Sequence, residues 1–176
     1  MYNLYLYKTI QLKNLFKSFF RNKKNEDKTE KKDLDYKYLP KKDEYIEERF
    51  TKKFSENGGK FLYASSREEC YDFFQKILDE NNWNKKTILC FKKSLINDFF
   101  DDINFEINKT NLNSNLLITG CEFLVAKDGS ILVSAHQIKS YKIKDIPVNI
   151  IVLAKTSQLS ETVSKGLEGI RIKYLN

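Results

Sequence analysis

The stretch from Ile118 to Gln137, ITGCEFLVAKDGSILVSAHQ, is the part of the sequence that decides the fold. An apolar run at residues 116–119 predicts a buried strand that ends at Gly120, where the backbone can turn tightly. Asp128-Gly129-Ser130 then has the composition of a turn, and residues 131–134 predict a second strand. The stretch therefore predicts a strand–turn–strand unit with polar residues close to its turns.

On both sides of this unit, segments with strand and helix patterns alternate. Further strands are predicted at residues 61–63, 87–91, 105–107 and 148–154, and helices at residues 45–54, 70–78 and 95–100. Gly58-Gly59 is typical of a helix C-terminus, and Ser65 and Ser66 with Glu68 and Glu69 are typical of a capping box. This alternation predicts a three-layer α/β fold, in which a mostly parallel sheet carries helices on both faces.

The last helix is expected to follow Ser157. Its apolar residues recur at helical spacing and are expected to face the core; they are Leu159, Val163, Leu167 and Ile170. In a sheet of this kind, ligands bind beyond the carboxyl ends of the strands. The segments at residues 119–130, 134–138 and 155–160 follow predicted strands, so a binding site is expected among them.

The chain divides into an extension, residues 1–38, and an α/β domain, residues 39–176. Leu12, Leu15, Phe16, Phe19 and Phe20 predict one apolar face of a basic helix, and residues 22–38 are almost wholly polar, as in a linker. Such a helix could contact a membrane surface through residues 1–21 or bind a protein partner. It could also pack on the domain, or reflect an upstream start codon.

The formal net charge of +7 is concentrated in the N-terminal third of the chain. Residues 1–60 hold 16 Lys and Arg against 10 Asp and Glu, whereas residues 61–176 hold 15 against 14. A nearly neutral domain speaks against nucleic-acid binding. The sequence shows neither a signal peptide nor a membrane-spanning run, which favours a cytoplasmic protein.

The three cysteines are widely spaced and favour reduced thiols over a metal site, an iron–sulfur cluster or a disulfide framework. No glycine-rich nucleotide-binding motif is present, so no cofactor is expected. Residues 55–58 spell SENG, a string that carries the nucleophilic glutamate in some CoA transferases. Here it stands before the first predicted strand, where the helix C-terminus is the better interpretation.

The candidate ligand-binding residues follow the predicted strands. Hydroxyls and backbone amides of that region can hold a carboxylate or phosphate, and the candidates are Thr119, Gly120, Asp128, Gly129, Ser130, His136, Thr156 and Ser157. Both glycines could instead serve only to shape turns.

Glu122 is the candidate catalytic residue, as a general base or a ligand contact. The alternative is an acid that stabilises a helix N-terminus. Cys121 could be activated at the same helix end, or paired with His136 as a nucleophile, although a buried apolar thiol is the simpler interpretation.

The order of these motifs resembles the LUD family (LutC/YkgG) of lactate utilisation proteins. The matching features are residues 118–133, the strand Pro147–Ala154 with Thr156-Ser157-Gln158 after it, and the lead-in DEYIEERFTKKFSENGGKFLY at residues 43–63. Together they span about residues 40–173. The sequence departs from the family at Asp128, where a threonine is usual. It also stops at Asn176, before the family's usual closing strand, as is expected either of a shortened member or of a cut reading frame.

The resemblance implies a fold like that of NagB, RpiA and the CoA transferases. It also implies a role in organic-acid (lactate) utilisation, as an accessory or small-anion-binding component beside iron–sulfur oxidoreductase partners. A different hypothesis is a non-catalytic interaction module that docks through its basic N-terminal helix. A third, based on fold analogy, is a transferase or hydrolase of acyl or phosphosugar substrates.

Overall fold

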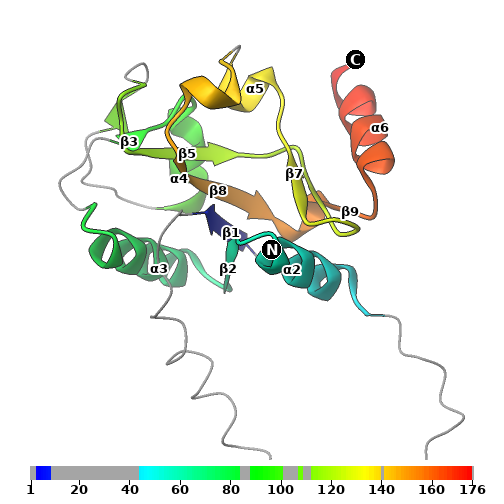
Figure 1. Cartoon of the computed structure of the whole chain (residues 1–176), viewed down its shortest axis with the longest axis horizontal. Helices are drawn as coiled ribbons and strands as arrows, with labels where there is room; N and C mark the ends of the chain where they lie inside the picture. Colours follow the sequence, from blue (N-terminus) through cyan, green and yellow to red (C-terminus); the bar gives the residue numbers. More distant parts are fainter. Residues whose placement is uncertain are drawn as a thin grey trace, which may run out of the picture.

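The computed structural model describes residues 3–8, 44–83, 88–100, 107–108, 112–139 and 141–175. Its main sheet has the strand order β2-β1-β8-β5-β3-β4. The strands are β1 (Asn3–Lys8), β2 (Lys60–Ala64), β3 (Ile88–Leu89), β4 (Ile107–Asn108), β5 (Leu116–Gly120) and β8 (Asn149–Lys155). The helices α2 (Ile46–Glu56), α3 (Arg67–Glu80) and α4 (Lys93–Phe99) cover this sheet, as Figure 1 shows.

The sheet is mostly parallel, as the alternating pattern predicts. Strands β8, β5, β3 and β4 run parallel to one another, and β5 and β8 pair with Thr119 opposite Val152. Strand β1 is the exception, because it pairs antiparallel with both β2 and β8. The carboxyl ends of β3, β5 and β8 therefore lie at one edge of the sheet.

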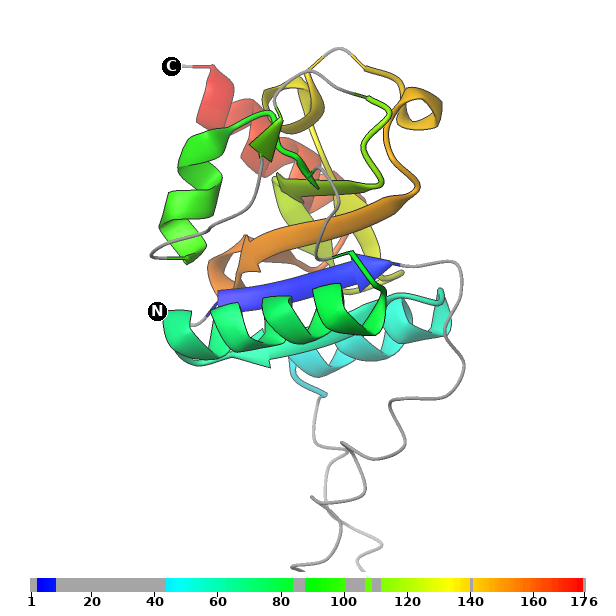
Figure 2. The same ribbon diagram turned by 90° about the vertical axis from the view of Figure 1, so that its left-hand side faces the viewer.

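The two faces of β8 pack against different layers. Ile151 and Leu153 belong to the core formed with α3 and α4, whereas Val152 and Ala154 belong to the core formed with α2. Figure 2 shows α3 in front of the stacked strands and α2 behind them. A strand buried on both faces reads as a continuous apolar run, which explains the pattern NIIVLA.

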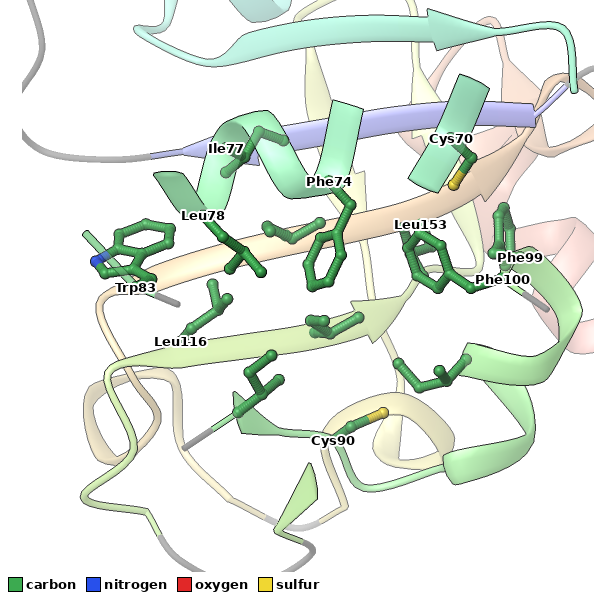
Figure 3. Close-up of a cluster of buried hydrophobic side chains, with 14 of the residues drawn as sticks. Cys70, Phe74, Ile77, Leu78, Trp83, Cys90, Phe99, Phe100, Leu116 and Leu153 are labelled. Carbon is green, nitrogen blue, oxygen red and sulfur yellow. The ribbon is translucent and has the colours of Figure 1, made fainter. Parts of the chain in front are cut away.

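Helix α3 covers its face of the sheet with one apolar stripe. Cys70, Phe74, Ile77 and Leu78 are buried, and Figure 3 shows them directed toward the sheet that carries Leu116 and Leu153. The helix begins as the sequence predicts, because the Ser66 side chain accepts a hydrogen bond from the backbone N–H of Glu69. This cap and the 3.6-residue spacing explain why the segment is helical.

A second, smaller sheet follows β5 directly. It has the order β7-β6-β9 and consists of β6 (Phe123–Val125), β7 (Ser130–Leu132) and β9 (Leu159–Ser160). The sequence had suggested a helix N-terminus near Cys121 and Glu122, and this expectation is wrong: the backbone N–H of Glu122 bonds the carbonyl of Leu132 across the small sheet. The interval between β5 and β6 is too short for a helix.

Helix α6 (Val163–Tyr174) packs on this small sheet through glycines rather than through the predicted apolar face. A Cβ at Gly166 would lie 2.6 Å from Cδ1 of Leu132, and one at Gly169 would lie 2.5 Å from Cζ of Phe123. The helix is therefore close to β6 and β7. By contrast, Leu167 is 55% exposed, so the expectation that it faces the core is corrected.

Two further differences from the sequence prediction concern the ends of the domain. Leu159 lies in strand β9, before the last helix begins. Residues 3–8, which the pattern had assigned to a helical extension, form strand β1, which lies between β2 and β8 in the main sheet. The predicted helix around residues 12–20 and the linker at 22–38 lie outside the described residues.

Candidate functional site

A pocket of about 730 Å³ lies where the carboxyl ends of β3, β5 and β8 meet. Its floor includes residues that end or follow these strands, and its walls come from α4, from the short helix α5 (Ala135–Ile138) and from the last turn of α6. Its polar, aromatic and strand-end lining residues include Lys92, Asp98, Thr119, Gly120, Cys121, Glu122, His136, Gln137, Lys155, Ser157, Gln158, Lys173 and Tyr174.

This position is the topological switch point of the sheet. From β3 the chain continues through α4 to β4 at one edge, whereas from β5 it continues to β8 on the other side. Adjacent strands whose connections leave in opposite directions create a crevice, and α/β proteins commonly bind ligands there. The fold therefore places a ligand-sized pocket where a binding site is expected.

Glu122 is the most constrained polar residue of the pocket. Its side chain is fully buried, and its Oε1 accepts hydrogen bonds from Ser134 Oγ at 2.7 Å, Gln137 Nε2 at 2.8 Å and Tyr174 OH at 2.7 Å. Its Oε2 accepts one from Lys173 Nζ at 2.8 Å. One carboxylate thus connects the turn after β5 to α5 and to α6.

This network keeps Glu122 ionised. Burial alone would raise its pKa, but the hydrogen bonds from Lys173, Ser134, Gln137 and Tyr174 outweigh burial and lower the pKa to about 2. At neutral pH such a carboxylate has little affinity for a proton, and both of its oxygens already have donors. These properties fit a structural role for Glu122 better than a role as a general base.

The short helix α5 is formed by the same residues that hold Glu122. Ser134 caps the helix by accepting a hydrogen bond from the backbone N–H of His136, and the Gln137 side chain accepts one from the backbone N–H of Ser134 at 2.7 Å. The Gln137 amide then donates to Glu122. The capping box and the carboxylate network are therefore one unit.

Cys121 is a buried thiol rather than an activated nucleophile. Burial, and then the negative charge of Glu122, raise its pKa to about 12. The turn that carries it is held by Gln158, whose side-chain amide donates to the carbonyl of Cys121 at 2.5 Å and to that of Glu122 at 3.3 Å. The geometry therefore supports the interpretation of Cys121 as a small apolar residue.

His136 and Tyr174 form an aromatic pair at the pocket. Their ring centroids are 4.2 Å apart and their planes differ by 6°. Both residues line the pocket, and both are exposed. Because the hydroxyl of Tyr174 is bound to Glu122, the pair is held in position from the buried side.

Three lysines and two carboxylates line the pocket. Lys173 is paired with Glu122, while Lys92 follows β3 and Lys155 ends β8, on either side of β5. Asp98, on α4, is the other carboxylate. The sequence analysis did not single out Lys92 or Lys173. Their positions could have indicated them, because Lys92 stands just after β3 and Lys173 stands at the end of α6.

The predicted site residues fall into two groups. Thr119, Gly120, Glu122, His136 and Ser157 line the pocket. The remaining candidates, Asp128, Gly129, Ser130 and Thr156, do not line it.

Asp128 and Ser130 shape the turn between β6 and β7. Asp128 Oδ1 accepts hydrogen bonds from the backbone N–H of Ser130 at 2.9 Å and from its hydroxyl at 2.6 Å. The Asp128 carbonyl accepts a bond from the Asn57 side chain at the end of α2. Gly129 has φ +71°, and a Cβ there would lie 2.4 Å from the backbone nitrogen of Phe54. This turn thus packs on α2, away from the pocket.

The described ranges contain neither a metal-ligating cluster nor a membrane-spanning helix. No group of three or more His, Cys, Asp or Glu side chains is arranged to hold a metal ion there. None of the helices in that part of the chain is both long enough and apolar enough to cross a bilayer.

The fold and the pocket define a class: a three-layer α/β domain with a ligand-sized pocket at its switch point. The model of the LUD domain family matches residues 47–175, so the chain belongs to the LUD domain family. The match covers every pocket residue named above. Searches of curated proteins and of solved structures found no match.

Proposed function

We propose that this chain binds a small carboxylate or another anionic metabolite in the pocket at the ends of β3, β5 and β8. Its role is that of an accessory component of organic-acid (lactate) utilisation in the cytoplasm, beside iron–sulfur oxidoreductase partners. The LUD domain is associated with lactate utilisation proteins, and the sequence resembles the LutC/YkgG members. Membership of the LUD family supports a role in lactate utilisation, whereas the pocket supports an anionic ligand.

The balance of charge in the pocket carries the proposal. The negative charge of Glu122 is compensated by Lys173 at 2.8 Å, so it does not repel an incoming anion strongly. Lys92 and Lys155 then leave a cationic excess over Asp98. The hydroxyl of Ser157 adds a neutral donor beside them, whereas the hydroxyl of Thr119 donates to the backbone carbonyls of Gly120 and Gln137.

In this proposal Glu122 is an anchor and not the general base. It holds Lys173 and Tyr174 against the turn after β5, and so it gives the pocket one of its walls. Its lowered pKa follows from that role. The ligand would be bound by Lys92, Lys155 and the hydroxyl of Ser157.

Isothermal titration of the purified full-length chain with L-lactate, pyruvate and neutral lactamide tests the binding step. We expect the two acids to bind and lactamide not to bind, because the lysines recognise the negative charge. Lys155→Met should weaken binding of the acids about tenfold. Lys144→Met, at an exposed lysine outside the pocket, is the matched control and should leave binding unchanged.

Absence of binding by either acid at millimolar concentration, with the chain folded, would refute the proposed ligand class. The process is tested separately by deleting the gene and measuring growth on lactate. Growth should slow, and the tagged chain should co-purify with an iron–sulfur oxidoreductase. Unchanged growth and unchanged organic-acid pools would remove the assignment to organic-acid utilisation.

A further inference from the structure

The pocket is larger than the simplest ligand of the proposed function requires. A three-carbon hydroxy acid, at roughly 30 Å³ for each water-sized group, fills on the order of 200 Å³. The pocket measures about 730 Å³. Pockets of roughly 300–1,000 Å³ usually hold drug-sized ligands. A part of this pocket is therefore available to a second portion of the ligand.

The wall formed by α5 and α6 offers a surface for that portion. The His136 and Tyr174 rings lie nearly parallel, with centroids 4.2 Å apart, on a wall of the pocket. Tyr174 remains 41% exposed although its hydroxyl bonds the buried Glu122. Exposed aromatic rings that are held rigidly are good stacking surfaces, because little side-chain freedom is lost on binding.

The two lysines that do not pair with Glu122 lie at the strand ends rather than on this wall. On the wall, Lys173 is paired with Glu122, and its Nζ lies 5.0 Å from the ring centroid of Tyr174. Lys92 follows β3 and Lys155 ends β8, so the cationic part of the pocket is built on the strand ends. The aromatic pair comes from α5 and α6. The pocket thus combines an anion-binding portion with an aromatic portion on different elements.

We infer that the ligand is an organic acid that carries a planar aromatic ring: its carboxylate binds at the strand ends near Lys92 and Lys155, and its ring stacks on the His136–Tyr174 pair. This inference rests on the proposed function and specifies its ligand. An aliphatic acid such as lactate uses only the first portion of the pocket. The ring adds a contact that selects among organic acids.

Four compounds separate these contributions in titrations of the full-length chain: lactate, 3-phenyllactate, 3-cyclohexyllactate and the neutral 3-phenylpropane-1,2-diol. We expect phenyllactate to bind most tightly. Cyclohexyllactate has a similar size but no planar π-system. The affinity of phenyllactate should exceed that of cyclohexyllactate by about three- to tenfold, which is the usual contribution of an aromatic contact beyond its buried area. The neutral diol should bind at least tenfold more weakly than phenyllactate.

Variants at His136 test the stacking surface without disturbing the core, because this residue is exposed. His136→Ala should reduce the preference for phenyllactate over cyclohexyllactate toward one. His136→Phe keeps a planar ring and should retain the preference. Thermal unfolding of both variants should remain a single cooperative transition, which shows that the domain is folded.

The outcomes distinguish this inference from the proposed function. Equal affinity for phenyllactate and cyclohexyllactate would overturn the aromatic part and leave anion binding in place. Equal affinity for phenyllactate and the neutral diol would overturn the assignment of the carboxylate to the lysines. Binding of none of the acids would overturn the proposed function itself.

Discussion

Lys173 Nζ lies 2.8 Å from Oε2 of Glu122, and this ion pair joins the last turn of α6 to the turn after β5. The two residues are 51 positions apart in the sequence. Tyr174 donates to the other oxygen of the same carboxylate. The end of the chain's last helix is thereby fixed to the edge of the main sheet, where the pocket lies.

Replacing Glu122 with glutamine should destabilise the protein. The variant keeps the shape of the side chain but removes the charge that binds Lys173. It also places an amide nitrogen, which is itself a donor, among groups that donate to the carboxylate. Hydrogen bonds to charged groups contribute about 1.5–3 kcal/mol, so we expect a loss of about 2 kcal/mol in the free energy of unfolding, measured with urea. Glu56→Gln, which removes an exposed partner of Lys53, is the control and should change it much less.

The same carboxylate predicts how stability depends on pH. Its pKa is about 2 in the folded protein, below its ordinary value of 4.5, so folding binds fewer protons there. Its stabilising contribution is therefore complete above pH of about 4.5 and is lost as the pH falls toward about 2. Urea unfolding at several pH values should show the difference between the unaltered chain and Glu122→Gln narrowing over this range. A constant difference would contradict the low pKa.

The close packing of α6 predicts that alanine at Gly169 is harmful although alanine favours helices. A Cβ there would lie 2.5 Å from Cζ of Phe123, so α6 or Phe123 must shift. We expect a loss of about 1–2 kcal/mol in the free energy of unfolding, as for other overpacked sites. Ser164→Ala, at an exposed position of the same helix, should be neutral or slightly stabilising.

A double variant checks this explanation. Phe123→Leu shortens the side chain that the new methyl group meets, so it should recover part of the loss caused by Gly169→Ala. Strict additivity of the two single changes would show that the effect of Gly169→Ala does not come from this contact.

Two glycines with positive φ provide a matched test of the β6–β7 turn. A Cβ at Gly129 would meet the backbone of Phe54, whereas a Cβ at Gly58 would meet nothing within 4 Å. Both positions carry the backbone penalty of about 1–2 kcal/mol for a non-glycine residue, but only Gly129 adds a clash with the backbone. Gly129→Ala should therefore lower the melting temperature more than Gly58→Ala. Neither should alter the affinity for an anion if this turn is structural.

Cys121 should react slowly with iodoacetamide in the folded protein. Its thiol is buried and its pKa is raised to about 12, so little thiolate exists at pH 8. Cys70 and Cys90 are buried as well, so mass spectrometry should detect labelling only after unfolding. Rapid labelling of Cys121 in the native chain would revive its interpretation as a nucleophile.

Much of the fold could be predicted because it depends on local patterns. The apolar run NIIVLA predicts a buried strand, and the spacing of Cys70, Phe74 and Leu78 predicts a helix, since burial against a sheet demands those periods. The strand β1 was missed because its residues stand near a stronger helical pattern. The small sheet was missed because β6 has only three residues and gains its partners from β7 and β9.

The candidate site was predictable only in part. Thr119 and Gly120 were found because they end a strand, and Glu122 because it follows that strand; the carboxyl ends of parallel strands meet at one edge of the sheet. Asp128 and Ser130 also follow a strand, but that strand belongs to the small sheet and directs its turn toward α2. The sequence does not distinguish these two cases.

By itself, the sequence determined the three-layer α/β class, the positions of most helices and strands, and the resemblance to the LUD family, because each of these depends on residues that are near one another in the chain. Only the tertiary structure decided that Lys173 and Tyr174 meet Glu122, and that His136 stacks on Tyr174. Those contacts require α6 to lie close to β6, which Gly166 and Gly169 allow. Residues so far apart in the chain leave no periodic pattern in the sequence, because only tertiary packing brings them together.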